Sequence, residues 1–200
     1  PAGTEKMAFH IASAFEYNLV YNGNMSATST LIGKNIQQGV VYEADGITIT
    51  AFDVDHSPPN IAPEDRVNFP ALGFRVDYAD HAIAISGDTR FSENLIEYSK
   101  GVDVLIHEVA PAADRASGRA SHHTSTVEAG EVFNRVQPKL AVYSHFPRGI
   151  NQRLIDQTRR VYDGPLLVGT EMTVITIGAS IEVVPGNSDP STAIQPGVEK

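Results

Sequence analysis

Three polar side chains each follow an apolar run with the composition of a β-strand. His56 follows the run that starts at Ile47, Asp88 follows Ala-Ile-Ala-Ile-Ser-Gly, and His145 follows Leu-Ala-Val-Tyr-Ser. A strand that carries a His or Asp at its carboxyl end places a potential ligand at a sheet edge, on a rigid support. Imidazole nitrogens and carboxylate oxygens are usual zinc ligands, and one carboxylate can bridge two cations about 3.5–4 Å apart. We therefore expect His56, Asp88 and His145 to contribute to a metal site.

Each of these residues also has an ordinary explanation when it is taken alone. A single histidine after a strand is commonly a surface residue, and Gly87-Asp88-Thr89 consists largely of turn formers. The shared plan of all three, each at the end of an apolar strand, favours the metal site over three unrelated turns.

The rest of the chain predicts a layered α/β domain, because strands and helices alternate along most of its length. A hairpin is expected at Asp45-Gly46, a strong turn signal, and Asp80 and His81 are expected in the next turn. The expected helices cover residues 4–15, 92–99, 126–136 and 151–162. The expected strands cover 40–43, 47–54, 71–78, 82–86, 102–106, 140–144, 166–169, 172–177 and 180–184. We assign residues 1–185 to one domain and residues 186–200, rich in Gly, Pro, Ser, Asn and Asp, to a flexible tail.

Composition sets broad limits on the class of protein. The 200 residues are 42% hydrophobic and carry a formal net charge of −9, with no Lys/Arg cluster to attract a phosphate backbone. No apolar run approaches the roughly 20 residues that cross a bilayer, and the first residues lack the plan of a signal peptide. We expect a soluble protein of the cytoplasm or periplasm. Cysteine is absent, so any metal must be held by His, Asp or Glu.

Four ordered motifs resemble the metallo-β-lactamase superfamily, in its ribonuclease Z-like and arylsulfatase-like branch. They are Ile-Ser-Gly-Asp-Thr-Arg from residue 85, Val-Asp-Val-Leu-Ile-His-Glu-Val from 102, His-His-Thr-Ser-Thr-Val-Glu-Ala-Gly from 122 and Leu-Ala-Val-Tyr-Ser-His-Phe from 140. The resemblance covers about residues 1–178 and implies the αββα sandwich of that family. It also implies two zinc ions, with Mn or Fe as alternatives, bridged by Asp88. His56 would bind the first metal and His145 the second.

The resemblance also implies two catalytic residues outside the metal ligands. His107-Glu108-Val109-Ala110 is similar to the family's His-Glu-Ala-Thr motif, and His123-Thr124-Ser125 is similar to its His-Ser-Thr motif. By this resemblance His123 contacts the anionic oxygen or the leaving group, and Glu108 orients it. A carboxylate bonded to an imidazole raises the imidazole's basicity and fixes its tautomer. The alternative for this segment is structural, because Ser125 and Glu128 have the spacing of a helix capping box.

Two other histidines near these motifs rank lower. His122 neighbours His123 but does not keep the family spacing. His107 should face the opposite side of its strand from Glu108, and we interpret it as structural.

The family signature His-x-His-x-Asp-His is absent from these 200 residues. The opening Pro-Ala-Gly-Thr-Glu-Lys-Met resembles a segment that lies downstream of that signature. We therefore expect the chain to be the C-terminal part of the fold, with the N-terminal half of the same fold supplying the remaining ligands. One face of the half-sheet would otherwise be exposed, so the N-terminal half is the expected partner, and a homodimer is possible.

The expected activity is metal-dependent hydrolysis of small phosphodiester, sulfate or related esters by a metal-activated water. In ribonuclease Z a transfer-RNA-gripping arm is inserted between the histidine matching His56 and the Gly-Asp-Thr motif. Only 32 positions separate His56 from Asp88 here, and the loop 57–69 has no net positive charge. A nucleic acid partner is accordingly not expected. The alternatives are a transfer-RNA 3′-processing endonuclease, a lactonase, and a catalytically inactive scaffold member of the fold.

Overall fold

The computed structural model describes residues 33–111, 122–146 and 151–186. All of its helices and strands belong to one compact unit that begins at Gln38. The strands are β1 (Gly39–Ala44), β2 (Ile47–Asp55), β3 (Pro70–Tyr78), β4 (His81–Ile85), β5 (Val104–Glu108), β6 (Leu140–Ser144), β7 (Leu166–Val168), β8 (Val174–Ile177) and β9 (Ile181–Val184). The helices are the 3-10 helix η1 (Pro63–Asn68) and the α-helices α2 (Glu93–Tyr98), α4 (Thr126–Val136) and α5 (Gln152–Arg159).

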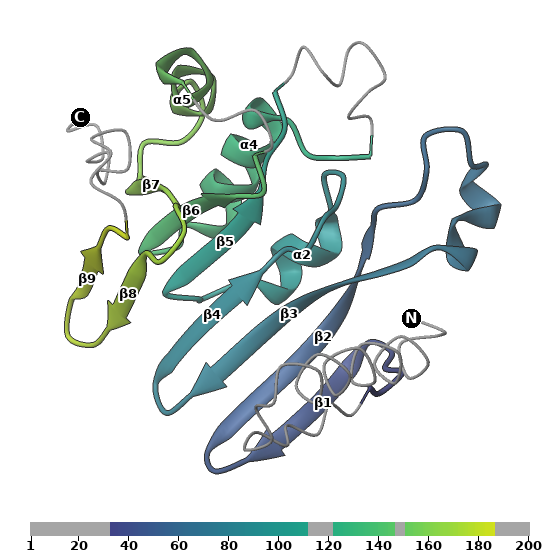
Figure 1. Ribbon diagram of the computed structural model, residues 1–200, viewed down its shortest axis with the longest axis horizontal. Helices are drawn as coiled ribbons and strands as arrows, with labels where there is room; N and C mark the ends of the chain where they lie inside the picture. Colours follow the sequence, from purple (N-terminus) through teal and green to yellow (C-terminus); the bar gives the residue numbers. More distant parts are fainter. Residues whose placement is uncertain (1–32, 112–121, 147–150, 187–200) are drawn as a thin grey trace, which may run out of the picture. The chain divides into compact units, whose positions relative to one another are not determined.

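Seven strands form one mixed sheet in the order β1-β2-β3-β4-β5-β6-β7 (Figure 1). Strands β1 to β4 pair antiparallel, whereas β4 to β7 pair parallel. It follows that β2, β4, β5 and β6 all run in the same direction. Their carboxyl ends therefore meet at one edge of the sheet, which is where α/β folds place reactive side chains.

The two faces of the sheet carry different layers because side chains alternate along each strand. On one face Leu105 of β5 and Tyr143 of β6 pack with Leu95 of α2, Phe133 of α4 and Ile155 of α5 in the main hydrophobic core. On the other face Val104 and Val142 belong to a smaller cluster that the apolar residues of the β8–β9 hairpin cover. This layered architecture confirms the α/β fold class.

Most of the predicted elements are present, and two predictions were wrong in detail. The fifth strand was expected at 102–106 but covers Val104–Glu108, because its parallel ladder with β6 continues to the pair Glu108 and Ser144. His81 was expected in a turn but is the first residue of β4, paired with Tyr78. Helix η1 was not predicted. The expected helix at 4–15 lies outside the described residues, as does nearly all of the tail assigned to 186–200.

The hairpin between β1 and β2 is the one expected from its sequence. Ala44 pairs with Ile47, and the two residues between them, Asp45 and Gly46, have φ values of 53° and 77°. Two successive residues with positive φ are the requirement of the tight turn that Asp-Gly favours. Within the described part of the chain, no helix is both long and apolar enough to cross a membrane.

Candidate metal and catalytic site

The structure brings the five predicted site residues to one edge of the sheet. His56 follows the last residue of β2, Asp88 lies three residues after β4, Glu108 ends β5, and His145 follows β6. His123 comes from the segment that leads into α4. The ring centroid of His123 lies 4.7 Å from that of His56 and 5.4 Å from that of His145. Side chains that are far apart in the sequence therefore lie next to one another.

The three predicted metal ligands have the spacing of a cation site. Oδ2 of Asp88 lies 3.5 Å from Nε2 of His145 and 3.9 Å from Nε2 of His56. Two ligand atoms about 2.0–2.2 Å from one tetrahedral ion stand roughly 3.4 Å apart, so small side-chain movements bring each pair onto an ion. The three do not form a group with every ligand atom within 4.8 Å of the others. Asp88 therefore lies near both imidazoles, while the three side chains do not converge on one point.

A hydrogen bond fixes the ring of His56. Its Nδ1 lies 3.1 Å from the carbonyl oxygen of His122. Since a carbonyl only accepts, Nδ1 carries the proton and Nε2 keeps the free lone pair. Nε2 is the nitrogen nearest Asp88, and a ligating histidine usually donates its other ring N–H in this way.

Two backbone conformations at the site are costly for most residues. Gly87 has φ of 59°, and a Cβ at this position would lie 2.5 Å from the carbonyl oxygen of Leu72. Only glycine fits, so the Gly-Asp pair sets the direction of Asp88. His145 itself has φ of 48°. A positive φ in a residue other than glycine is uncommon and concentrates at functional sites, where surrounding contacts hold it in place.

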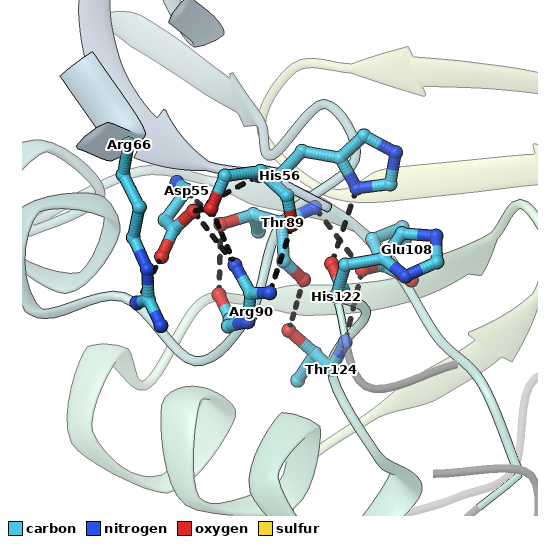
Figure 2. A network of polar contacts seen from close by, with 9 residues as sticks. Asp55, His56, Arg66, Thr89, Arg90, Glu108, His122 and Thr124 are labelled. Atoms are coloured by element: carbon cyan, nitrogen blue, oxygen red, sulfur yellow. Dashed lines mark hydrogen bonds and ion pairs between the residues drawn. The ribbon is translucent and has the colours of Figure 1, made fainter. Parts of the chain in front are cut away.

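Glu108 is almost fully buried and joins the segments that carry Asp88 and His123. Its Oε1 accepts hydrogen bonds from the backbone N–H of Thr89 at 3.1 Å and of Thr124 at 2.9 Å (Figure 2). Its Oε2 has no hydrogen-bond partner among the described residues. Burial raises the pKa of Glu108 to about 8, although the two N–H donors act in the opposite direction. At neutral pH the side chain is therefore mostly a neutral carboxylic acid.

His123 faces this acid. Its Nδ1 lies 3.2 Å from Oε1 of Glu108, without the alignment of a formed hydrogen bond. Burial, followed by the nearby imidazoles of His122 and His56, lowers the pKa of His123 to about 4. In the ion-free chain, burial lowers the pKa of His123 and raises that of Glu108, so burial opposes the expected effect of a Glu108 carboxylate on His123. Burial keeps the proton on Glu108, and the pair as a whole carries one acidic proton.

His122 is closer to the site than its sequence spacing indicated. The ligand atoms of His56, His122 and His123 all lie within 4.8 Å of one another, a grouping that could itself hold a metal ion. Burial and the charges of His56 and Arg90 lower the pKa of His122. The only sequence signal for this residue was its place beside His123.

A second polar cluster was missed by sequence reasoning. Asp55, next to His56, receives Nη1 of Arg90 on Oδ1 at 2.7 Å and Nη1 of Arg66 on Oδ2 at 2.8 Å (Figure 2). Burial opposes ionisation of Asp55, but hydrogen bonds from Ser57 and the charges of Arg90 and Arg66 outweigh it and hold its pKa below the usual value. The signal available in the sequence was the position of Asp55 directly before His56 and of Arg90 two residues after Asp88.

Among the described residues, His107 and His81 take structural positions. His107 is fully buried, donates from Nδ1 to the carbonyl of Glu108 and packs edge-on against Phe133 in the helix-covered core. Its pKa is lowered to about 4 by burial. His81 lies 3.3 Å from Asp103 at the opposite end of the strands. The capping box of Ser125 and Glu128 is complete, so this segment starts a helix as well as carrying His123.

An open cleft of about 620 Å³ lies beside His145. Its walls come from the ends of β5 and β6 and from the segment between β7 and β8, and they include Val142, Phe146, Thr170 and Glu171. This volume is within the range of small-molecule sites. The cleft is largely apolar with a few polar groups, and His145 is one of them.

The comparisons with known proteins agree with this geometry. The family model described as Beta-lactamase superfamily domain matches residues 3–146. A ribonuclease Z from Mycobacterium sp. (strain KMS) is 27% identical over 158 residues, 73% of this chain and 52% of that protein. A ribonuclease Z from Mycobacterium tuberculosis (strain ATCC 25618 / H37Rv) is 22% identical over 187 residues, 86% of this chain and 65% of that protein. The chain thus spans about half to two thirds of the length of these relatives.

Solved structures support the same fold. The metallo-β-lactamase fold protein YhfI from Bacillus subtilis matches with a TM-score of 0.57 and 18% identity, over 78% of this chain and 60% of that one. An isothiocyanate hydrolase from Delia radicum gut bacteria matches with a TM-score of 0.52 and 13% identity, over 78% and 62%. At such identities the likeness concerns the fold alone. With a family model that covers most of its length, the chain belongs to the metallo-β-lactamase superfamily and is ribonuclease Z-like.

Proposed function

We propose that this chain is part of a metal-dependent hydrolase that cleaves small phosphodiester, sulfate or related esters. The observation that carries the proposal is the single carboxylate oxygen of Asp88 between the imidazoles of His145 and His56, at 3.5 and 3.9 Å. Nitrogen and oxygen donors without any thiolate suit zinc, with Mn or Fe as alternatives. When bound, two such cations supply a water nucleophile at neutral pH and neutralise the charge of the ester.

The ligand set on this chain is incomplete for two ions. His56, Asp88 and His145 provide three protein ligands, and a His-x-His-x-Asp-His motif elsewhere in the fold would provide the others. On these 200 residues that motif does not occur.

We assign the proton supply to the pair of Glu108 and His123. Burial raises the pKa of Glu108 and so favours its protonated form, and His123, with Nδ1 3.2 Å from Oε1 of Glu108, is the member of the pair that stands beside His56 and His145. When the ester bond breaks, His123 gives a proton from its ring to the leaving oxygen and is reprotonated at the other ring nitrogen from Glu108. General acid catalysis of this kind contributes about 10²–10⁴-fold to a rate.

We propose a small substrate because of the volume of the cleft beside His145 and the short segment between His56 and Asp88. The cleft beside His145 holds about 620 Å³, room for a small ester. Between His56 and Asp88 the chain contains a loop with η1 and the strands β3 and β4. No inserted arm occurs in this fully described interval, so remote binding energy from a large RNA has no such arm to act through.

Transfer-RNA processing is the second candidate, favoured by the relatives that are named ribonuclease Z. These relatives make a nucleic acid partner plausible, against the expectation from the net charge and from the short interval between His56 and Asp88. The test compares turnover of a precursor transfer RNA with that of aryl phosphodiesters, aryl sulfates and lactones, using the whole protein at matched metal loading. We expect a higher specificity constant for a small ester. A far higher value for the RNA would replace this proposal with the endonuclease.

A catalytically inactive scaffold is distinguished by metal analysis. The whole protein is expected to hold about two metal ions per protomer if it is a hydrolase. A protein that binds no metal and cleaves none of these substrates would be the scaffold.

A further inference from the structure

We propose that Asp55 and Arg90 are positioning residues for the cation site, and that together with Ser57 they set its metal affinity. The inference rests on the proposed function, because it concerns the spacing of His56 and Asp88. We call Asp55, Ser57 and Arg90 the Asp55 clamp.

Two residues of the Asp55 clamp flank His56 in the sequence. Asp55 precedes this histidine and Ser57 follows it, and Ser57 is fully buried. Within this stretch the backbone N–H and the hydroxyl of Ser57 both donate to Oδ1 of Asp55, at 3.0 and 2.5 Å. The carboxylate therefore closes a small loop around the histidine and limits the backbone positions that His56 can adopt.

Five hydrogen bonds then join this loop to the two residues that follow Asp88. The backbone N–H of Arg90 donates to the carbonyl of Asp55 at 2.8 Å, and the N–H of Asp55 donates to the hydroxyl of Thr89 at 3.2 Å. The guanidinium of Arg90 donates to Oδ1 of Asp55 at 2.7 Å, to the hydroxyl of Ser57 at 3.0 Å and to the carbonyl of Ser57 at 2.8 Å. A shift of His56 relative to Asp88 must break several of these bonds together.

The guanidinium of Arg90 is committed to these contacts and is mostly buried, with 14% of its side chain exposed. Its planar fork reaches a carboxylate and a carbonyl at the same time, which a lysine ammonium cannot reproduce. We therefore assign it to holding the two ligand segments, not to binding a substrate anion. In Figure 2 the guanidinium groups of Arg90 and Arg66 both contact the carboxylate of Asp55.

Arg75 offers a matched control on the same sheet. Its guanidinium also binds one carboxylate, that of Asp77, at 2.9–3.0 Å, and two backbone carbonyls, those of Tyr98 and Lys100, at 2.9 and 2.8 Å. It lies on β3 and contacts none of the five predicted site residues. Removing Arg75 or Arg90 therefore removes similar bonds, but only Arg90 adjoins the site.

The experiment measures the affinity of the metal-free whole protein for Zn²⁺ by competition with a chromophoric chelator. We expect Arg90→Ala and Asp55→Asn to lose about 10–100-fold in affinity, as is typical when groups that orient metal ligands are removed. Arg75→Ala should bind Zn²⁺ like the wild type. Excess Zn²⁺ should restore turnover to the Arg90 variants, which a general folding defect would not allow. Arg90→Lys keeps the charge and serves if Arg90→Ala does not fold, and it should also bind more weakly than the wild type.

Two results distinguish a failure of the positioning role from a failure of the proposed function. Folded Arg90→Lys and Asp55→Asn proteins that bind Zn²⁺ as tightly as the wild type would overturn the positioning role alone. A wild-type protein that binds none of Zn²⁺, Mn²⁺ and Fe²⁺ would overturn the proposed function, and the positioning role with it.

Discussion

Replacing Glu108 by glutamine should stabilise the metal-free protein at alkaline pH while slowing the reaction. The folded-state pKa of Glu108 is about 8, against 4.5 for the free side chain, because the folded chain buries this group. A group with a raised pKa stabilises the fold fully below its unfolded pKa, and this contribution is lost as the pH rises through the folded pKa. Wild-type protein must therefore lose stability between pH 4.5 and 8, whereas glutamine stays neutral throughout.

The size of the effect follows from the shift. A difference of 3.5 pH units between the two pKa values, at about 1.36 kcal/mol per unit, corresponds to roughly 5 kcal/mol in full, of which roughly 4 kcal/mol is lost by pH 8, where Glu108 is half ionised. Glutamine also keeps an oxygen for the N–H groups of Thr89 and Thr124 that Oε1 of Glu108 now accepts. The substitution thus removes the ionisation and little else.

The assay is urea unfolding of the metal-free protein at pH 5, 7 and 8.5. Glu93→Gln is the control, because this exposed carboxylate pairs with Arg135 and its pKa is lowered, so it stays ionised throughout this range and its removal should leave the pH slope unchanged. Glu108→Gln should also reduce turnover of an ester at least tenfold, since the proton source is gone. Parallel stability curves for the wild type and Glu108→Gln across this range would refute the reasoning.

Three further predictions concern single residues. His123→Ala should lower turnover about 10²–10⁴-fold with metal content nearly intact, as for a proton donor that is not a ligand; equal loss of metal and turnover would make it a ligand. Wild-type protein should lose roughly 3 kcal/mol of unfolding free energy as the pH falls from 6.5 to 4, because the pKa of buried His107 is lowered to about 4. His107→Gln should abolish this loss, which urea unfolding at both pH values measures. Gly87→Ala should destabilise the fold by about 1–3 kcal/mol and reduce Zn²⁺ affinity, because of its positive φ and the carbonyl of Leu72. Gly101→Ala, where φ is also positive but the space is open, should affect stability alone.

Strand periodicity and turn residues were sufficient to predict most of the fold. Alternation and the Asp-Gly turn placed β1 and β2, and the capping residues placed α4 at the observed bounds. The fifth strand was misplaced because His107 and Glu108 interrupt its apolar pattern, although the ladder with β6 continues through both. Hydrogen bonding, not hydrophobicity, decides where that strand ends.

Sequence reasoning could select site residues only where they follow the end of an expected strand. That rule selected His56, Asp88 and His145, which the fold places at one edge of the sheet. It could not find the contact between Asp55 and Arg90, 35 positions apart, since only the pairing of strands brings these residues together. Nor could it find the protonation of Glu108, which depends on how deeply the folded chain buries that side chain.

The most direct test of the cation site is metal content measured together with turnover for Asp88→Ala, His56→Ala and His145→Ala in the whole protein. Oδ2 of Asp88 lies within 4 Å of both imidazoles, so its loss should release both ions, while each histidine variant leaves one ion with most of its ligands. We expect Asp88→Ala to retain the least metal and no measurable turnover. Asp88→Ala protein that keeps two metal ions per protomer and a normal rate would contradict the assignment of the site.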